Sequence, residues 1–190
     1  SLDRRQRQMC IRDSLRLVPA KPYKDPGNYV RYSERLAAEL ARTHEAGVIW
    51  ANQFDNTANL RGHYRTTGPE IWEQTGGAIH GFTCAVGSGG TIAGVGKYLK
   101  EQKKDVRIAL SDPDGSALYG YYIHGELKAE GNSISEGIGQ GRITTNLADA
   151  PIDTAYRLPD AVALPIIYDL MRDEGLYLGG STAINIAGAM

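Results

Sequence analysis

The chain has 190 residues, a formal net charge of −1 and a hydrophobic fraction of 42%. This is an ordinary globular composition, long enough for one domain or somewhat more. Nothing in the sequence suggests a basic surface for nucleic acid, and no apolar run approaches the ~18 residues of a membrane helix. Two cysteines, Cys10 and Cys84, cannot form a disulfide framework, which favours a reducing cytoplasm.

Residues 1–14 (SLDRRQRQMCIRDS) are basic and polar, without the apolar core of a signal peptide. The run from Arg4 to Ser14 looks like the translation of a sequencing adapter. We therefore interpret residues 1–14 as a non-native or disordered arm and exclude it from the fold. A native basic arm is the alternative.

The first regular elements form a strand–helix–strand pattern. Residues 15–18 (LRLV) and 48–52 are predicted strands, and Asn28 is placed to cap a helix that extends to about Thr43. A strand, a helix and a strand at this spacing predict a βαβ unit with parallel strands. After a loop at 53–59, helices are predicted over 57–64 and 69–74.

The most informative stretch is 81–100, which reads GFTCAVGSGGTIAGVGKYLK. The apolar run 82–86 predicts a strand, and Ile92, Val95 and Leu99 return at helical spacing. The glycines between these elements, with the hydroxyls of Ser88 and Thr91, predict a loop whose amide groups and helix dipole bind an anion such as phosphate. A tight turn that binds nothing is the alternative.

The loop matches neither common nucleotide-binding pattern. Lys97 follows Gly96 but precedes Tyr98, so the Ser or Thr of Walker A is missing. The dinucleotide fingerprint fails because Ile92 stands where its third glycine belongs. The predicted site is therefore a phosphate cradle of another kind.

The later elements continue the α/β pattern. Strands are predicted over 106–111, 155–158 and 177–178, and helices over 117–123, over 160–174 with Asp160 as the cap, and from 179 onward. Asp112 and Asp114 fit a turn better than a cation site. Cys84 fits a buried hydrophobe rather than a nucleophile. The histidines lack metal-ligand spacing and fit surface or helix-end roles; they are His44, His63, His80 and His124.

Four stretches in order resemble one family, the cysteine synthase (O-acetylserine sulfhydrylase) type of fold type II pyridoxal phosphate enzyme. They are NQFDNTAN with TTGPEIWEQTGG, GSGGT with the helix after it, SISEGIGQG and GLYLGGSTAIN. The resemblance covers nearly everything from Leu15 onward. It implies a three-layer α/β/α fold with a mostly parallel sheet. It also implies a remnant of a small N-terminal α/β domain at 15–60 and a truncated large domain at 61–190.

The resemblance assigns roles to individual residues. The pyridoxal phosphate ester would be held by Gly87, Ser88, Gly89, Gly90 and Thr91. Gly137 would line the cofactor ring, Ser181 would meet the pyridine nitrogen, and Gln53 would bind the substrate carboxylate. The alternatives are a flexible loop at Gly137, a helix cap at Ser181 and a structural loop amide at Gln53.

The resemblance also shows departures. The family's SSGIN appears here as STAIN, so Ala183 replaces a glycine, and Ser88 stands where threonine is usual. The cofactor-binding lysine and the Ser/Thr-Gly-Asn loop of the family precede everything matched here. No lysine of this chain occupies the family's lysine context; the lysines are Lys21, Lys24, Lys97, Lys100, Lys103, Lys104 and Lys128. We therefore expect no catalytic lysine and no activity from this chain alone.

The resemblance implies a parent enzyme that makes cysteine and acetate from O-acetylserine and sulfide by β-elimination and β-replacement. The expected parent is a cytoplasmic homodimer without metal, nucleic-acid or membrane partners. Cystathionine β-synthase and threonine dehydratase are rivals in the same family, although the Gly-Gly-Thr ending of the loop favours cysteine synthase over the dehydratase. A non-catalytic anion-binding module and a purely structural α/β domain are the alternatives outside it.

Overall fold

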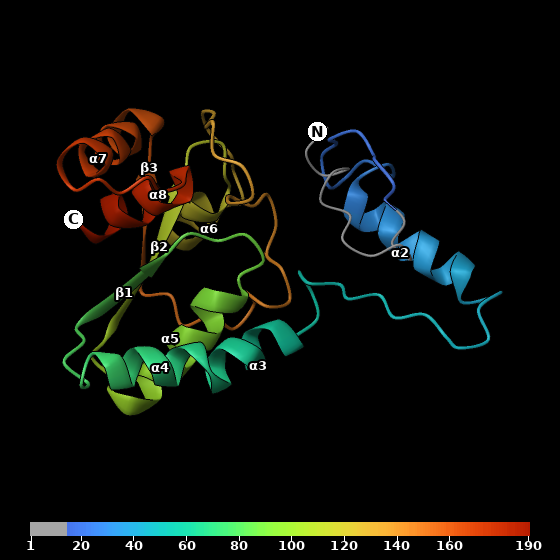
Figure 1. The fold of residues 1–190 in the computed structure, drawn as a ribbon, viewed down its shortest axis with the longest axis horizontal. Helices are drawn as coiled ribbons and strands as arrows, with labels where there is room; N and C mark the ends of the chain where they lie inside the picture. Colours follow the sequence, from blue (N-terminus) through green and yellow to red (C-terminus); the bar gives the residue numbers. More distant parts are fainter. Residues whose placement is uncertain (1–14) are drawn as a thin grey trace. The chain divides into compact units, whose positions relative to one another are not determined.

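The computed structural model describes residues 15–190, which fall into two compact units with a boundary between Asn52 and Gln53 (Figure 1). The domain division predicted at residues 60 and 61 stays a prediction. The interpretation of residues 1–14 as an artefact lies outside the described residues.

The smaller unit contains one helix, α2 (Tyr29–Leu40), in its described part. The side-chain oxygen of Asn28 accepts a hydrogen bond from the Val30 amide at 3.0 Å, so Asn28 caps the helix as predicted. The two strands predicted at 15–18 and 48–52 are wrong, because both segments are irregular. The apolar pattern favours extended chain, but a strand forms only when its amides pair with a neighbour, and Ile49 is 96% exposed.

The larger unit is built on a parallel sheet of three strands in the order β1 (Gly81–Cys84), β2 (Arg107–Pro113) and β3 (Thr154–Leu158). Cys84 pairs with Leu110, and Leu110 pairs with Ala155. The chain passes from β1 to β2 through α5 (Gly90–Gln102) and from β2 to β3 through α6 (Leu118–His124). Helical crossovers of this kind connect parallel strands, so all three strands end at the same edge of the sheet.

Helices cover both faces of this sheet (Figure 1). On one side lie α3 (Ala58–Arg65), α4 (Thr67–Gln74) and α5; on the other lie α7 (Asp160–Asp173) and α8 (Gly180–Ala189). Two hydrophobic clusters match these sides. The larger cluster joins Ile92, Val95 and Leu99 of α5 to the sheet, and the smaller joins α7 and α8 through Ala163, Ala183 and Ile184. The three-layer α/β/α prediction is confirmed.

The contact between α8 and the sheet is unusually close. A Cβ atom on Gly188 would overlap the Ser111 hydroxyl and would lie 3.1 Å from Thr83 Oγ1. Ser111 is fully buried, and its hydroxyl lies 2.6 Å from that of Thr83, so the two polar groups satisfy each other beneath the helix. Glycine at position 188 is what lets α8 approach.

Two local predictions in the C-terminal part are wrong. Residues 177–178 are irregular rather than a strand, and Tyr177 is 87% exposed. Asp160 is the first residue of α7 instead of its cap, which is Pro159. The Asp160 carboxylate instead accepts hydrogen bonds from the Ser133 hydroxyl at 2.6 Å and the Ile134 amide at 2.8 Å. A carboxylate at a helix N-terminus can accept hydrogen bonds from a neighbouring loop instead of from its own helix, and here it fixes the segment at 133–135.

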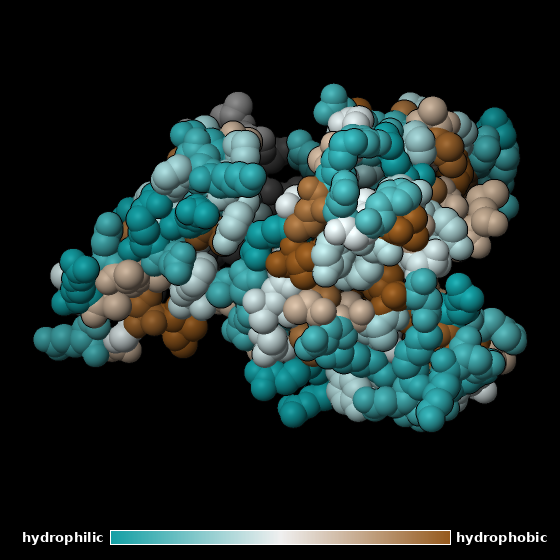
Figure 2. Space-filling view, turned by 180° about the vertical axis from the view of Figure 1, so that it is seen from behind, coloured by the Kyte–Doolittle hydropathy of each residue, from teal (hydrophilic) through white to brown (hydrophobic). Residues whose placement is uncertain are grey.

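Large hydrophobic side chains also reach the surface of this unit, including Val162, Tyr168 and Met171 of α7. Figure 2 shows patches of hydrophobic surface, in brown, between hydrophilic regions. Among the described residues, no helix is long and apolar enough to cross a membrane.

Candidate functional site

The loop between β1 and α5 presents a group of amides without acceptors. Gly89 adopts φ of 89°, in the left-handed region, which turns the chain into the first residue of α5. Within residues 15–190, no acceptor is found for the amides of Gly87, Ser88, Gly89, Thr91 and Ile92. Free amides at a helix N-terminus attract an anion.

Two side chains of α3 contact the hydroxyl groups of this loop. Asn59 Nδ2 donates a hydrogen bond to Ser88 Oγ at 2.8 Å, and His63 Nε2 lies 3.2 Å from Thr91 Oγ1. The sequence interpretation missed both residues, having placed His63 at the surface or a helix end. Their spacing of four residues places both side chains on one face of α3, but α4 and β1 separate this helix from the loop, so no local signal links them to it.

A distant segment closes over the same loop. The Gly139 amide donates to the Val86 carbonyl at 2.8 Å, and Thr144 Oγ1 donates to the Ser88 carbonyl at 2.7 Å. A Cβ on Gly87 would come within 2.7 Å of the Gly137 carbonyl oxygen. The structure therefore brings Gly137 next to the loop, as a residue lining the same site would require.

Gln53 lies close to this arrangement through its backbone. Its carbonyl accepts hydrogen bonds from Asn59 Nδ2 at 2.8 Å and Asn146 Nδ2 at 3.1 Å. Its side chain is exposed, so the predicted contact of that amide with a substrate stays a prediction. Asn146 is almost fully buried and also donates to the Phe54 carbonyl at 2.7 Å, which makes it a structural tie between the segments at 53–54 and 144–147.

Ser181 is linked to the strand that carries the loop. It is the second residue of α8, and its carbonyl accepts a hydrogen bond from Asn185 Nδ2 at 2.8 Å. The Oδ1 atom of Asn185 in turn accepts from the Ala85 amide at 2.7 Å. Ser181 also lines a cavity of about 300 Å³ together with Ser135 and Glu136. The start of α8 is thus fixed to the chain two residues before Gly87.

The departure at Ala183 is accommodated without strain. Ala183 lies inside α8, fully buried, and it is not among the described residues with positive φ. Its methyl group joins the smaller hydrophobic cluster. The backbone shift that alanine would cause at a left-handed position therefore does not arise.

Three of the lysines have partners away from the loop. Lys100 Nζ lies 2.7 Å from the Asp153 carboxylate, Lys103 Nζ donates to the Ile79 carbonyl at 3.0 Å, and Lys128 pairs with Glu130 at 2.8 Å. Burial raises the pKa of the Cys84 thiol to about 11, so this thiol is not an activated nucleophile. Within residues 15–190, no group of His, Cys, Asp and Glu side chains could hold a metal ion.

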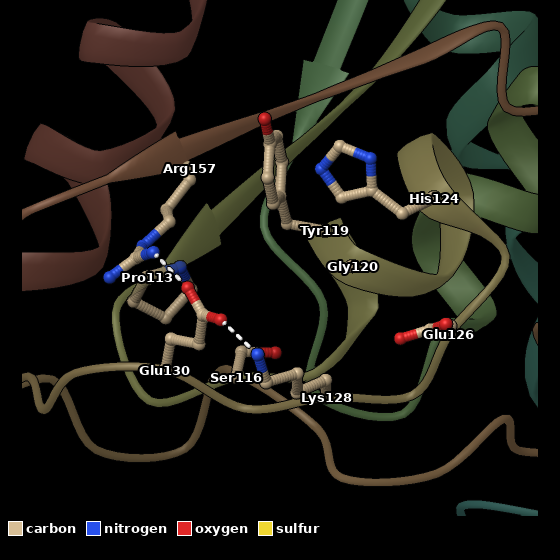
Figure 3. A pocket seen from close by; sticks show the side chains of 9 residues that line it. All are labelled: Pro113, Ser116, Tyr119, Gly120, His124, Glu126, Lys128, Glu130 and Arg157. Atoms are coloured by element: carbon tan, nitrogen blue, oxygen red, sulfur yellow. Dashed lines mark hydrogen bonds and ion pairs between the residues drawn. The ribbon is translucent and has the colours of Figure 1, made fainter.

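A second cavity, of about 240 Å³, lies between α6 and the loop that follows it (Figure 3). Its polar wall is an ion-pair network in which Glu130 accepts from both Arg157 and Lys128, at 2.9 and 2.8 Å. Arg157 also pairs with Asp114 at 2.6 Å. These charges neutralise one another and fix the loop to β3. The residues predicted to hold a cofactor are not among those that line this cavity.

The family described as pyridoxal-phosphate dependent enzyme matches residues 13–190, and the chain belongs to that family. The chain is 45% identical over 177 residues to Cysteine synthase 1 of Neurospora crassa, covering 90% of this chain and 46% of the relative. It is 46% identical to Cysteine synthase 1 of Emericella nidulans, with the same coverage. The chain thus spans about half the length of the relatives it matches.

The fold resembles a solved structure, that of the O-acetylserine dependent cystathionine beta-synthase from Helicobacter pylori. The TM-score is 0.70 at 29% sequence identity, and the match covers 82% of this chain and 48% of the other. The parallel sheet with helices on both faces is therefore the architecture of a fold type II pyridoxal phosphate enzyme. Free amides, two loop hydroxyls and a helix N-terminus fit a phosphate ester, which is how this family's cofactor would be anchored.

Proposed function

We propose that this chain is the part of a cysteine synthase that holds the phosphate of pyridoxal phosphate. The parent enzyme would convert O-acetylserine and sulfide to cysteine and acetate by β-elimination and β-replacement. The observation that carries the proposal is the loop at 87–92, where the amides of all residues except Gly90 have no acceptor within the described chain. Such a loop binds an anion with charge-assisted hydrogen bonds.

The proposed cofactor contacts divide among three segments. Gly87, Ser88, Gly89, Gly90 and Thr91 would surround the phosphate. Gly137, whose carbonyl approaches Gly87, would lie beside the ring. Bound there, pyridoxal phosphate would supply the electron sink for β-elimination. Ser181 would donate its hydroxyl to the pyridine nitrogen, and Gln53 would bind the substrate carboxylate.

A hydroxyl at position 181 has a chemical consequence. Ser181 would leave the pyridine nitrogen neutral, whereas an aspartate would hold it protonated and make a stronger electron sink. The milder sink suits β-replacement. Ser181 is exposed at the start of α8, so it is accessible to a small molecule.

Two further parts of the proposal concern the whole protein. The chain alone would be inactive, because its lysines lie outside the lysine context of the family and Lys100, Lys103 and Lys128 have other partners. The parent would be a cytoplasmic homodimer acting on small molecules, without nucleic-acid or membrane partners.

A cystathionine β-synthase activity is the second candidate, favoured by the likeness to the Helicobacter pylori structure. Both candidates share the β-replacement step and differ in the sulfur nucleophile. An anion-binding module without catalysis is the remaining alternative.

The test is a titration of this chain with pyridoxal phosphate and with pyridoxal, which lacks the phosphate. Proposed binding predicts a higher melting temperature with pyridoxal phosphate and little change with pyridoxal. Equal effects of the two compounds, or none, would contradict the phosphate cradle. Borohydride reduction followed by peptide mapping tests inactivity, because a cofactor adduct at one defined lysine would overturn it.

A further inference from the structure

Two residues one helical turn apart on α3 contact the two hydroxyls of the phosphate loop. Asn59 reaches Ser88, and His63 reaches Thr91. Ser88, Thr91 and His63 are all half-buried, so these hydrogen bonds are shielded from full competition with water. Neither Asn59 nor His63 belongs to the loop itself.

The close approach of α3 depends on glycines in α5. A Cβ on Gly94 would lie 2.7 Å from His63 Cβ and would overlap the Leu60 carbonyl, while a Cβ on Gly90 would overlap the Asn59 side chain. Any side chain at these two positions would push α3 away from the loop. The packing is therefore arranged so that Asn59 and His63 can reach the loop hydroxyls.

His63 has a second partner that fixes its ring. Its Nδ1 atom lies 3.0 Å from Thr67 Oγ1, and its Nε2 atom lies 3.2 Å from Thr91 Oγ1. A neutral imidazole donates through one nitrogen and accepts through the other. The chain Thr67–His63–Thr91 can therefore run in either of two directions, and the direction decides what the Thr91 hydroxyl does with its proton.

We propose that His63 is a positioning residue for phosphate binding, which directs the Thr91 hydroxyl proton toward the bound phosphate. The Thr67 hydroxyl donates to Nδ1, Nε2–H donates to Thr91 Oγ1, and the Thr91 proton is left for the anion. If the chain ran the other way, Thr91 would donate to the histidine and present only lone pairs to the anion. An anion selects the first direction.

Asn59 acts on Ser88 in the same way. Its Nδ2 group donates to Ser88 Oγ at 2.8 Å and to the Gln53 carbonyl at 2.8 Å, which uses both of its protons. Because Ser88 Oγ accepts from Asn59, its own proton is available to a ligand. Helix α3 thus sets both hydroxyls as donors before the phosphate arrives, which lowers the ordering cost of binding.

This inference rests on the proposed function, and its test keeps the two separate. The 190-residue chain is titrated calorimetrically with pyridoxal phosphate and with pyridoxal, and the ratio of their affinities isolates the phosphate contribution. Thr91→Val tests the contact of the Thr91 hydroxyl with the phosphate, because loss of one charge-assisted donor should lower the affinity for pyridoxal phosphate about tenfold and leave pyridoxal unchanged.

His63→Leu tests the hydrogen-bond relay from Thr67 through His63 to Thr91. We expect the same affinity ratio to fall about threefold to tenfold, and the double variant with Thr91→Val to bind no more weakly than Thr91→Val alone. His63→Gln, whose amide can both donate and accept, should recover much of the loss. Gly62→Ala is the matched control on α3, because a Cβ there meets nothing within 4 Å.

Each outcome decides one of the two claims. Absence of phosphate-dependent binding by the unsubstituted chain overturns the cradle and the relay together. Unchanged phosphate affinity in Thr91→Val overturns the relay alone, because the loop amides remain in that variant. A normal Thr91→Val effect with an unaffected ratio in His63→Leu overturns the relay alone. So does a His63→Leu loss that adds fully to that of Thr91→Val. A loss shared equally by pyridoxal phosphate and pyridoxal would assign His63 a structural role only.

Discussion

Asp55 and Arg142 lie 87 residues apart in the sequence and form a two-pronged ion pair, with nitrogen–oxygen distances of 3.0 and 2.8 Å. The Thr145 amide also donates to Asp55, at 2.9 Å. This pair holds the chain just before α3 against the segment that covers the loop at 87–91. The ion pair therefore supports the candidate site, and no local sequence pattern indicates it.

The Asp55–Arg142 pair predicts a specific acid sensitivity. Hydrogen bonding from Arg142 lowers the pKa of the Asp55 carboxyl from 3.8 to about 2. A lowered pKa in the folded state stabilises the fold above pH 4, and that stability is lost as the pH falls toward 2. Between pH 5 and pH 2.5, the free energy of unfolding should fall by about 1 to 2 kcal/mol more in the unsubstituted chain than in Asp55→Asn, after allowance for solvent screening. Urea unfolding at the two pH values measures this difference. Asp149→Asn, at an exposed position of the same segment, is the control; an identical acid response in all three proteins would contradict the prediction.

For Asp112 we predict the opposite pH dependence of its contribution to the free energy of unfolding. It is fully buried, and its Oδ1 atom has no partner among the described residues, while the Tyr119 amide donates to Oδ2 at 2.7 Å. Burial raises the pKa of this carboxyl above 3.8, so its ionised form costs stability at neutral pH, and the cost vanishes below pH 3.8. Asp112→Asn should raise stability by about 1 kcal/mol at pH 7 and by nothing at pH 3.5. A less stable Asp112→Asn protein at pH 7, measured by thermal unfolding, would show that the charge is needed.

We predict that a side chain at position 188 disturbs the packing of α8 on the sheet. Gly188→Ala places a methyl group on the Ser111 hydroxyl, so α8 must move away from the sheet at a cost of about 1 to 3 kcal/mol. Gly179→Ala, where a Cβ meets nothing within 4 Å, should change stability by less than about 1 kcal/mol. Denaturant midpoints compare the two variants directly. Equal stabilities would mean that α8 is not seated as closely as the structure shows.

We predict that the thiol of Cys84 is alkylated slowly in the folded state. Its thiol donates to the Ala85 carbonyl at 3.1 Å, and burial holds its pKa at about 11, so little thiolate forms at pH 8. In a Cys10→Ser background, alkylation by iodoacetamide should be at least about a hundredfold slower in buffer than in 6 M urea, on the order of the thiolate deficit. Rapid labelling of the folded chain would contradict the burial of β1.

Much of the larger unit could be predicted because its signals are local. The apolar runs before Gly87 and around Leu110 marked two strands, and the spacing of Ile92, Val95 and Leu99 marked α5. The mostly parallel sheet was implied by the resemblance of four such stretches to one family. These features depend on residues close together in the sequence.

The failures concern features that depend on distant partners. The segments at 15–18 and 48–52 have strand-like patterns but no pairing, and Asp160 serves the loop at 133–135 instead of capping its own helix. His63 and Asn59 resemble ordinary helix residues until the fold places Thr91 of α5 and Ser88 of the preceding loop beside them. The glycine loop was visible in the sequence, but the residues that orient its hydroxyls were not.

The long reach of Thr144 has a consequence for biosynthesis. Thr144 secures the Ser88 carbonyl across 56 residues, and Asn146 secures the Gln53 carbonyl across 93. At a translation rate of ~5–20 residues per second, roughly 3–11 s pass between the synthesis of Ser88 and the synthesis of Thr144. Until then the nascent loop lacks its covering segment, so premature capture of a phosphate compound on the ribosome would be weak. Ribosomes stalled before and after residue 146 would reveal the step as a gain in protease resistance.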